Sequence, residues 1–281
     1  MQLKQALSHA VSDLSSQNVP SARMSAELLL MFTLGCDRAY LFAHPERELS
    51  TEESSRYKTA LAERARGVPA QYITGHQEFW GMDLIVSPAV LIPRPETEHV
   101  VETALDLIPA RRSEIRIVDV GTGSGALALA LAREFSKAEI HATDISSAAL
   151  EVAKANAASL ELNDRVQFHN ADLLEGLSGN FDLIVSNPPY VGESEEDQVQ
   201  REVRKFEPRT AVFAGAKGTE VIARLIPQAL EILRPGGWLV FEISGTIADQ
   251  VQPLLADWNE LKVIPDLQGI ARVVRARKPL G

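Results

Sequence analysis

The tetrapeptide Asn187-Pro188-Pro189-Tyr190 combines residue types that could hold a planar nitrogen during a group-transfer reaction. It follows the apolar run FDLIVS at 181–186, which is typical of a buried strand. One proline would be enough to end that strand, so the second indicates a further purpose. Each proline restricts the residue before it to extended geometry, which fixes the backbone of Asn187 and of Pro188.

The chemistry that suits this motif is alkylation of an amide or adenine-type nitrogen. The lone pair of such a nitrogen is delocalised, and two acceptors that grip its N–H bonds would orient it toward an electrophile. The side-chain oxygen of Asn187 and the carbonyl of Pro188 could act as these acceptors, held in place before the substrate arrives. The ring of Tyr190 offers a face for the flat group. We predict that Asn187, Pro188, Pro189 and Tyr190 form the catalytic and substrate-binding site.

A sulfonium methyl group is a fitting electrophile because its positive charge already activates it. Methyl transfer then depends on alignment more than on a strong base or a protein nucleophile. The only cysteine, Cys36, lies far from the tetrapeptide in a helical segment, and the six histidines follow no metal-ligand or triad spacing. We therefore predict no metal site.

A glycine-rich loop follows an apolar strand that we predict at 115–120. Glycines at such a turn let the backbone approach a ligand closely and bend into the next helix. The loop also fits the dinucleotide pattern G-x-G-x-x-A, so by itself it leaves a nicotinamide enzyme open. The residues predicted to bind a cofactor here are Asp119, Gly121, Thr122, Gly123, Ser124 and Gly125.

Acidic residues near the ends of the predicted strands favour an adenosine-type ligand. Asp144 ends the second strand, 23 residues after Gly121, where its carboxylate can accept hydrogen bonds from both ribose hydroxyls. Asp119 lies inside an apolar strand, so it must be hydrogen-bonded, either to the loop backbone or to the amino group of the ligand. Asp172 follows the third strand and could contact an adenine amino group, although an ordinary turn is an equally natural interpretation.

The apolar periodicity predicts two kinds of structure along the chain. Residues 3–14, 20–35 and 50–67 read as helices, the last opened by a capping-box pair of Ser50 and Glu53. Residues 77–93 read as a β-hairpin. From about residue 96 strands and helices alternate, which is typical of a parallel sheet with helices on both faces. The strands that we predict are 115–120, 139–143, 166–169, 181–186, 238–243, 262–265 and 272–277.

These patterns define three parts of an α/β protein. We predict a helical N-terminal domain at 1–72, a hairpin linker at 73–95 and a ligand-binding sheet domain at 96–281. The whole 281-residue chain carries a net charge of −10, while residues 1–75 hold eight basic and eight acidic side chains. This balance argues against stable nucleic-acid binding. With one cysteine and no long apolar segment, we expect a cytoplasmic protein without membrane contact. We expect it to be a monomer, although the sequence carries no signal for or against self-association.

Several motifs together resemble one known enzyme family. The runs DVGTGSG at 119–125 and SNPPY at 186–190 are similar to S-adenosylmethionine-dependent N-methyltransferases with a seven-stranded, Rossmann-like sheet. The runs AELLL at 26–30, EFWG at 78–81, IPRPETE at 92–98, FEP at 206–208 and RVV at 272–274 resemble the release factor glutamine methyltransferases, the PrmC/HemK family. The resemblance spans nearly the whole chain.

The resemblance implies a donor, a substrate and residue roles. The expected reaction moves a methyl group from S-adenosylmethionine to the side-chain amide nitrogen of the glutamine in the Gly-Gly-Gln loop of peptide chain release factors, which the N-terminal domain would dock. The glycine loop, Asp144 and Asn187 would contact the methyl donor. Leu173 takes a position that is often aromatic in relatives, so it would offer the adenine only an apolar wall. We expect Arg94 and Glu98 to be structural.

Two other functions fit parts of the sequence. A methyltransferase acting on adenine amines of nucleic acid could use the same tetrapeptide, but it would need a basic base-reading module. A noncatalytic binding protein could keep the fold, yet it would have no need for an intact tetrapeptide and glycine loop. The acidic run at 193–197 is typical of a solvated face, and docking of a basic partner is the alternative.

Overall fold

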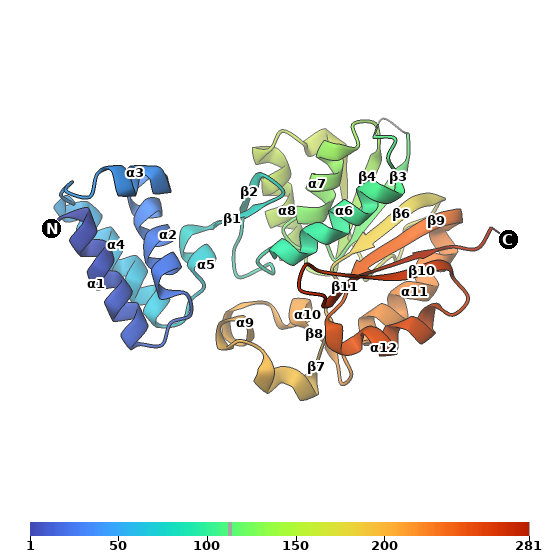
Figure 1. The fold of residues 1–281 in the computed structure, drawn as a ribbon. Coiled ribbons are helices and arrows are strands. Elements are labelled where there is room, and N and C mark those ends of the chain that lie inside the picture. Colours follow the sequence, from blue (N-terminus) through green and yellow to red (C-terminus); the bar gives the residue numbers. More distant parts are fainter. Residues whose placement is uncertain (112–113, 281) are drawn as a thin grey trace. The chain divides into compact units, whose positions relative to one another are not determined.

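A computed structural model describes residues 1–111 and 114–280 of the chain (Figure 1). The chain forms two units, each with its own core. The helical unit comprises Met1–His76 together with Arg201–Phe206, and the sheet unit comprises Gln77–Gln200 and Glu207–Gly281, whose last residue lies outside the described residues. These units differ from the predicted three-part division in two respects: residues 201–206 pack with the N-terminal helices, and most of the predicted linker at 73–95 belongs to the sheet unit.

The helical unit follows the predicted periodicity. Leu3, Ala6, Ala10 and Leu14 form the buried face of the first helix, three and four residues apart. Three short helices that the periodicity did not predict, α3, α5 and α9, complete the unit, because one or two helical turns carry too few apolar repeats to be recognised. The helices are α1 (Leu3–Ser16), α2 (Ala22–Leu34), α3 (Arg38–Ala43), α4 (Thr51–Ala65), α5 (Ala70–Thr74) and α9 (Arg201–Phe206).

Capping residues set the ends of these helices. The Ser50 hydroxyl accepts from the Glu53 amide, and the Glu53 carboxylate accepts from the Ser50 amide, which confirms the predicted capping box of α4. Asp37 caps the unpredicted helix α3 by accepting from the amide of Tyr40. Gly35 ends α2 in the left-handed conformation, which glycine adopts without strain.

A buried arginine joins α9 to the rest of the helical unit. Arg64 is only 4% exposed and forms an ion pair with Glu202 of α9 at 2.7 Å. Its guanidinium also donates to the Ser25 hydroxyl and the Val68 carbonyl. Because a buried guanidinium is costly without partners, this set of bonds holds α9 against α2 and α4.

The sheet unit contains a mixed seven-stranded sheet with the order β10-β11-β9-β6-β3-β4-β5. The strands β9, β6, β3, β4 and β5 run parallel, whereas β11 is antiparallel to both of its neighbours. The seven predicted strands are thus confirmed, but the sheet is not parallel throughout. The strands are β3 (Arg116–Val120), β4 (Glu139–Asp144), β5 (Val166–Asn170), β6 (Phe181–Ser186), β9 (Leu233–Glu242), β10 (Asn259–Pro265) and β11 (Ala271–Arg277).

Helices cover both faces of this sheet (Figure 1). Alternate residues of each strand point to opposite faces, so Ile117 packs toward α6, α7 and α8, while Val118 packs toward α11 and α12. The covering helices are α6 (Glu98–Leu107), α7 (Ala126–Glu134), α8 (Ser147–Ser159), α11 (Glu220–Ile232) and α12 (Ala248–Val251). Shorter elements are β7 (Val191–Gly192), β8 (Phe213–Gly215), α10 (Arg209–Val212) and the 3-10 turns Pro95–Thr97, Asn163–Arg165, Glu193–Gln198, Gly245–Ile247 and Gln252–Leu255.

A hairpin is present at the start of the predicted range 77–93, but it ends at residue 85, and it packs in the core of the sheet unit. It consists of β1 (His76–Phe79) and β2 (Met82–Ile85), joined by Trp80 and Gly81, both with positive φ. Two such residues are the signature of a tight hairpin turn that matches strand twist. Phe79, Met82 and Leu84 are fully buried against α6 and α7. The hairpin therefore packs as an integral layer of the unit.

One buried asparagine ties this hairpin to the glycine loop. Asn156 of α8 is fully buried, and its oxygen accepts from the Ile85 amide at 2.6 Å. Its Nδ2 donates to the Ile85 carbonyl at 2.9 Å and to the Ser124 carbonyl at 2.8 Å. All three bonds join segments far apart in the sequence, so Asn156 fixes the loop against β2 and α8.

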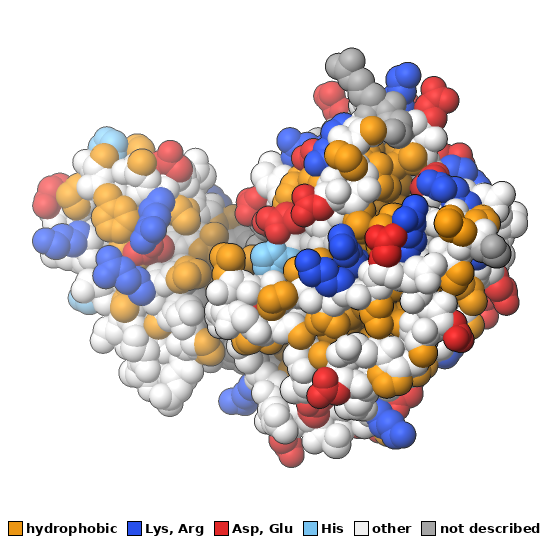
Figure 2. Space-filling view, turned by 45° about the vertical axis from the view of Figure 1, so that its right-hand side comes forward, with side chains coloured by type: hydrophobic (Ala, Val, Ile, Leu, Met, Phe, Trp, Pro, Cys, Tyr) orange, Lys and Arg blue, Asp and Glu red, His pale blue; other side chains and the backbone are white. Residues whose placement is uncertain are grey.

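The surface gives no sign of a single-sign electrostatic patch on the face in view. Figure 2 shows basic and acidic side chains interspersed over the sheet unit. Within residues 1–111 and 114–280, no helix has the length and apolar character needed to cross a membrane.

Asn156→Ala should destabilise the sheet unit by about 2–4 kcal/mol, because it leaves buried backbone groups unpaired. All three tryptophans, Trp80, Trp238 and Trp258, lie in the sheet unit, so tryptophan fluorescence during urea unfolding reports on this unit alone. The exposed Asn163 provides the control, and Asn163→Ala should change the free energy of unfolding by less than about 0.5 kcal/mol. Equal urea midpoints of unfolding for Asn156→Ala and Asn163→Ala would contradict the structural role of Asn156.

Candidate functional site

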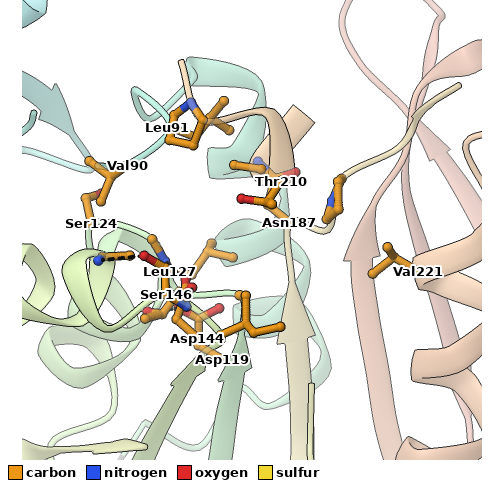
Figure 3. A pocket seen from close by; sticks show the side chains of 18 of the residues that line it. Val90, Leu91, Asp119, Ser124, Leu127, Asp144, Ser146, Asn187, Thr210 and Val221 are labelled. Carbon is orange, nitrogen blue, oxygen red and sulfur yellow. Dashed lines mark hydrogen bonds between the residues drawn. The ribbon is translucent and has the colours of Figure 1, made fainter. Parts of the chain in front are cut away.

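A cavity of about 340 Å³ opens at the carboxyl ends of the parallel strands (Figure 3). It lies wholly within the sheet unit, and its volume falls in the range of small-molecule sites. Asp119 and Asp144 line one part of it, and Asn187 and Thr210 line another. Of the predicted site residues, the cavity wall includes Asp119, Gly121, Thr122, Gly123, Ser124, Asp144, Asp172, Leu173, Asn187 and Pro189.

The glycine loop owes its shape to backbone conformation and to anchoring at β4. Gly121 and Gly123 have φ of +71° and +56°, and an added Cβ would meet no protein atom within 4 Å at either position. Glycine is therefore favoured at both positions by the left-handed backbone conformation. The absence of neighbouring atoms leaves open space beside this backbone. The amides of Gly121 and Thr122 both donate to the Thr143 carbonyl at 2.9 Å. Gly125 differs, because a Cβ there would also crowd Leu129 and Ala153.

Asp119 anchors the loop from below. Its Oδ2 accepts from the Thr122 hydroxyl at 2.6 Å and from the Ala128 amide at 3.1 Å. The side chain is 1% exposed, and this burial raises its pKa to about 7, with the nearby charge of Asp144 acting in the same direction. Two roles were predicted for Asp119, anchoring the loop or binding the amino group of the ligand. The structure contains the bonds for the first role, and the second stays a prediction.

Asp144 lies at the end of β4 with both carboxylate oxygens engaged. Oδ2 accepts from the Gly123 amide at 2.9 Å, and Oδ1 accepts from the Ser146 amide at 2.8 Å. Burial raises its pKa, while the two backbone donors lower it. Each carboxylate oxygen can accept more than one hydrogen bond, so Asp144 retains the capacity to bind ligand hydroxyls.

The residues after β5 form a further part of the wall. Asp172 lines the cavity, and its Oδ2 forms an ion pair with Arg224 at 2.6 Å. Leu173 also lines the cavity and has a φ of +56°, a conformation that is strained for a branched apolar residue. Contact of these two residues with an adenine ring stays a prediction.

The segment that carries Ala89, Val90 and Leu91 covers the cavity from another side (Figure 3). An ion pair holds the end of this segment, because Arg94 binds the buried carboxylate of Glu207, which also accepts from the Ile92 amide. Glu98 accepts from the Trp80 amide in the hairpin turn at 2.7 Å. These bonds are structural, which is the role predicted for Arg94 and Glu98.

The predicted catalytic tetrapeptide sits above a buried hydrogen-bond network. The Nδ2 of Asn187 donates to the Thr97 hydroxyl at 3.0 Å, and that hydroxyl donates to Oε2 of Glu242 at 2.6 Å. The Tyr190 hydroxyl donates to Oε1 of Glu242 at 3.0 Å. Burial raises the pKa of Glu242, whereas the two hydroxyl donors and the charge of Arg272 lower it.

Not every member of the tetrapeptide reaches the cavity. Asn187 and Pro189 line it, while Pro188 and Tyr190 do not belong to its wall. Tyr190 is instead packed against the core beside α11 and α12, and burial raises the pKa of its hydroxyl. The proposed packing of its ring against a substrate group stays a prediction, as does the acceptor role of the Pro188 carbonyl.

Thr97 and Glu242 are functional candidates that the sequence reasoning missed. Glu242 ends the apolar strand β9, and an acidic residue there carries the same signal that identified Asp119. Thr97 lies in the IPRPETE run but bears no charge to single it out. The described part of the chain contains no group of three or more His, Cys, Asp or Glu side chains placed to hold a metal ion.

The pKa of Asp119 predicts a pH dependence of stability. Because the pKa rises from 3.8 in an unfolded reference to about 7 in the fold, the contribution of Asp119 is full below pH 4 and is lost as pH rises through 7. The loss is on the order of 4 kcal/mol. Asp119→Asn titrates in neither state, so its stability relative to the unmodified protein should improve between pH 5 and 7.5 in urea unfolding followed by tryptophan fluorescence. Parallel pH profiles for the two proteins would contradict the buried, protonatable carboxyl.

Comparison with known proteins covers both units. The family model for the PrmC N-terminal domain matches residues 5–75, and that for the methyltransferase small domain matches residues 101–205. A release factor glutamine methyltransferase of Koribacter versatilis is 56% identical over 99% of each chain. One of Rhodopirellula baltica is 40% identical, over 92% of this chain and 90% of that relative.

Solved structures with lower identity share the fold. The Thermus thermophilus 16S rRNA N2 G1207 methyltransferase, in complex with AdoMet and guanosine, matches 72% of this chain and 49% of its own with a TM-score of 0.56 and 21% identity. The N-terminal domain of human METTL16, in complex with SAH, matches 84% of this chain and 86% of its own with a TM-score of 0.51 and 17% identity. At 21% and 17% identity these two structures show that the fold is shared, and they give no evidence on the substrate.

The Koribacter versatilis and Rhodopirellula baltica relatives cover 99% and 92% of the chain, and residues 5–75 of the helical unit match the model of the PrmC N-terminal domain. The resemblance seen in the sequence is confirmed: the chain belongs to the family of release factor glutamine methyltransferases, whose methyl donor is S-adenosylmethionine.

Proposed function

We propose that this protein transfers a methyl group from S-adenosylmethionine to the side-chain amide nitrogen of the glutamine in the Gly-Gly-Gln loop of peptide chain release factors. Family membership supports the donor and the reaction class. The observation that carries the acceptor assignment is the orientation of Asn187, whose Nδ2 is engaged by Thr97 at the cavity wall. Its Oδ1 is then the atom left to accept from a substrate amide.

The cavity fits the methyl donor. The open backbone at Gly121 and Gly123 accommodates a ligand, and Asp144 has acceptor capacity for the ribose hydroxyls. The apolar side chains of Leu127 and Leu173 offer surface to the adenine ring. When bound, S-adenosylmethionine supplies a methyl group activated by the positive charge on sulfur.

The residues of the chain then act on the glutamine amide. In this reaction the amide nitrogen would supply the electron pair for the new N–C bond, the electrons of the broken C–S bond would stay on sulfur, and the nitrogen would lose one proton to solvent water. The role of Asn187 Oδ1, and of the Pro188 carbonyl in our proposal, is to accept the two N–H bonds and aim the lone pair at the methyl carbon. These oxygens also stabilise the N–H groups as they become more acidic.

The helical unit supports the proposed substrate class. Residues 5–75 match the PrmC N-terminal domain, and the domain division that we propose assigns docking of the release factor to residues 1–72, with a linker at 73–95 and a catalytic part at 96–281. We propose that the reaction occurs in the cytoplasm, where release factors act, and that the protein works as a monomer. The interspersed charges in Figure 2 add no support for a nucleic-acid substrate.

A labelling experiment tests the proposal. Radiolabelled S-adenosylmethionine is offered with a purified bacterial release factor, with a variant of that factor whose loop glutamine is changed to glutamate, and with a DNA duplex. Only the unmodified release factor should gain label, because a carboxylate has no N–H bonds to offer the acceptor oxygens. Label in the duplex, or in the glutamate variant at an equal rate, would refute the assignment.

Asn187→Ala should lower the turnover number by roughly 100-fold or more, because it removes one oriented acceptor at the reacting nitrogen. Binding of S-adenosylmethionine should change little, since the glycine loop and Asp144 remain. Steady-state kinetics with a release factor and calorimetric titration with the methyl donor measure the two effects separately. Near-normal turnover would discredit the role of Asn187.

A further inference from the structure

Behind the tetrapeptide lies a chain of hydrogen bonds that runs from Asn187 through Thr97 to Glu242. The three residues come from different elements: Asn187 follows β6, Thr97 ends the 3-10 turn Pro95–Thr97, and Glu242 ends β9. Strands β6 and β9 are adjacent and parallel, with Ser186 opposite Phe241. Parallel pairing therefore places Asn187 and Glu242 at the same edge of the sheet, and Thr97 bridges them.

Burial fixes the donor-to-acceptor direction of these hydrogen bonds. Glu242 is 1% exposed and Thr97 is 4% exposed, so water does not compete for their bonds. The Thr97 hydroxyl has one proton, and it donates that proton to Oε2 of Glu242. Its oxygen can then only accept from Asn187, and the donor group of Asn187 is the amide NH₂.

The second oxygen of Glu242 is also engaged. Oε1 accepts from the Tyr190 hydroxyl, so one carboxylate holds both ends of the tetrapeptide. Arg272 contributes a positive charge near this carboxylate, and Glu96 contributes a negative one. A carboxylate buried to this degree is costly, and a bystander position in the core would be better filled by an apolar side chain.

We propose that Glu242, acting through Thr97, is a positioning residue that sets which end of the Asn187 amide faces the substrate. This inference rests on the proposed function and deepens it. With NH₂ turned toward Thr97, Asn187 presents Oδ1 to the N–H bonds of the glutamine. A reversed amide would present NH₂ to NH₂, and the reacting nitrogen would lose its acceptor.

Glu242→Gln tests the direction of the chain while keeping the size of the side chain. The amide of the new glutamine can donate to Thr97, which frees the Thr97 proton for Oδ1 of Asn187 and allows the Asn187 amide to reverse. Thr97→Val removes the bridging hydroxyl with little change in shape, and Thr97→Ser keeps it. The exposed Glu231 on α11 provides the matched control, Glu231→Gln.

The expected result is a fall in kcat of roughly 10- to 100-fold for Glu242→Gln and for Thr97→Val on a purified release factor. The kcat of Thr97→Ser should be at least about ten-fold higher than that of Thr97→Val. The kcat of Glu231→Gln should equal that of the unmodified protein. The Kd for S-adenosylhomocysteine should stay within about three-fold for all these variants, since the relay, meaning the hydrogen bonds from Asn187 through Thr97 to Glu242, acts on the methyl acceptor. A kcat within two-fold of normal for both Glu242→Gln and Thr97→Val would overturn the inference.

Nuclear magnetic resonance of the protein loaded with S-adenosylhomocysteine gives a readout that does not need turnover. The side-chain NH₂ signal of Asn187, identified by its loss in Asn187→Asp, should exchange slowly with solvent in the unmodified protein and in Thr97→Ser. Exchange should be at least ten-fold faster in Thr97→Val, and equal exchange would overturn the relay. If the unmodified protein labels no release factor, the proposed function fails, and this measurement still decides the relay. If Glu242→Gln does not fold, the kcat and the amide exchange rate of Thr97→Val still test the proposed role of Thr97.

Discussion

The parallel pairing of β3, β4, β6 and β9 is the constraint on which the site depends. Parallel strands end at the same edge of a sheet, so residues separated by more than 120 positions come together there. Asp119, Asp144, Asn187 and Glu242 each lie at or next to the carboxyl end of one of these strands. The helices on both faces bury the strands and hold their ends at fixed spacing, and this is why a few polar residues at one edge suffice to build a site.

Three buried side chains of this unit, Asp119, Asn156 and Glu207, hold the loops around the cavity by hydrogen bonds. Asp119 holds the glycine loop from inside β3, Asn156 ties the same loop to the hairpin, and Glu207 holds the covering segment through Arg94. The bonds of Asn156 and Glu207 join segments that are distant in sequence, whereas those of Asp119 are local. Because an unpaired polar group is costly in the core, every such set of bonds also disfavours alternative positions of the loop it holds. The ligand site is therefore preorganised by hydrogen bonds at its back, while its open side keeps the backbone of Gly121 and Gly123 accessible.

The network under the tetrapeptide gives a physical reason for its composition. The two prolines fix the backbone, but an asparagine amide can still rotate by half a turn with almost no change in shape. Only hydrogen-bond partners distinguish its two ends, and Thr97 with Glu242 supplies that distinction. The tyrosine closes the network from the other side through Glu242. The hydroxyl of Tyr190 binds Glu242, whereas the sequence predicted that its ring packs against the substrate. One tyrosine side chain can do both, because the hydroxyl and the ring face are separate parts of it.

The sequence by itself determined the seven strands, the three main N-terminal helices, the hairpin, the glycine loop and the family, because these depend on local periodicity, on turn residues and on contiguous motifs. It did not reveal the antiparallel β11, the short helices α3 and α5, or the packing of residues 201–206 with the N-terminal helices. Nor did it reveal that Thr97 and Glu242, 145 positions apart, share a hydrogen bond with consequences for Asn187. Strand direction and side-chain partnership arise from contacts between distant segments, and a pattern read along the chain carries no information on which distant group will satisfy a buried one.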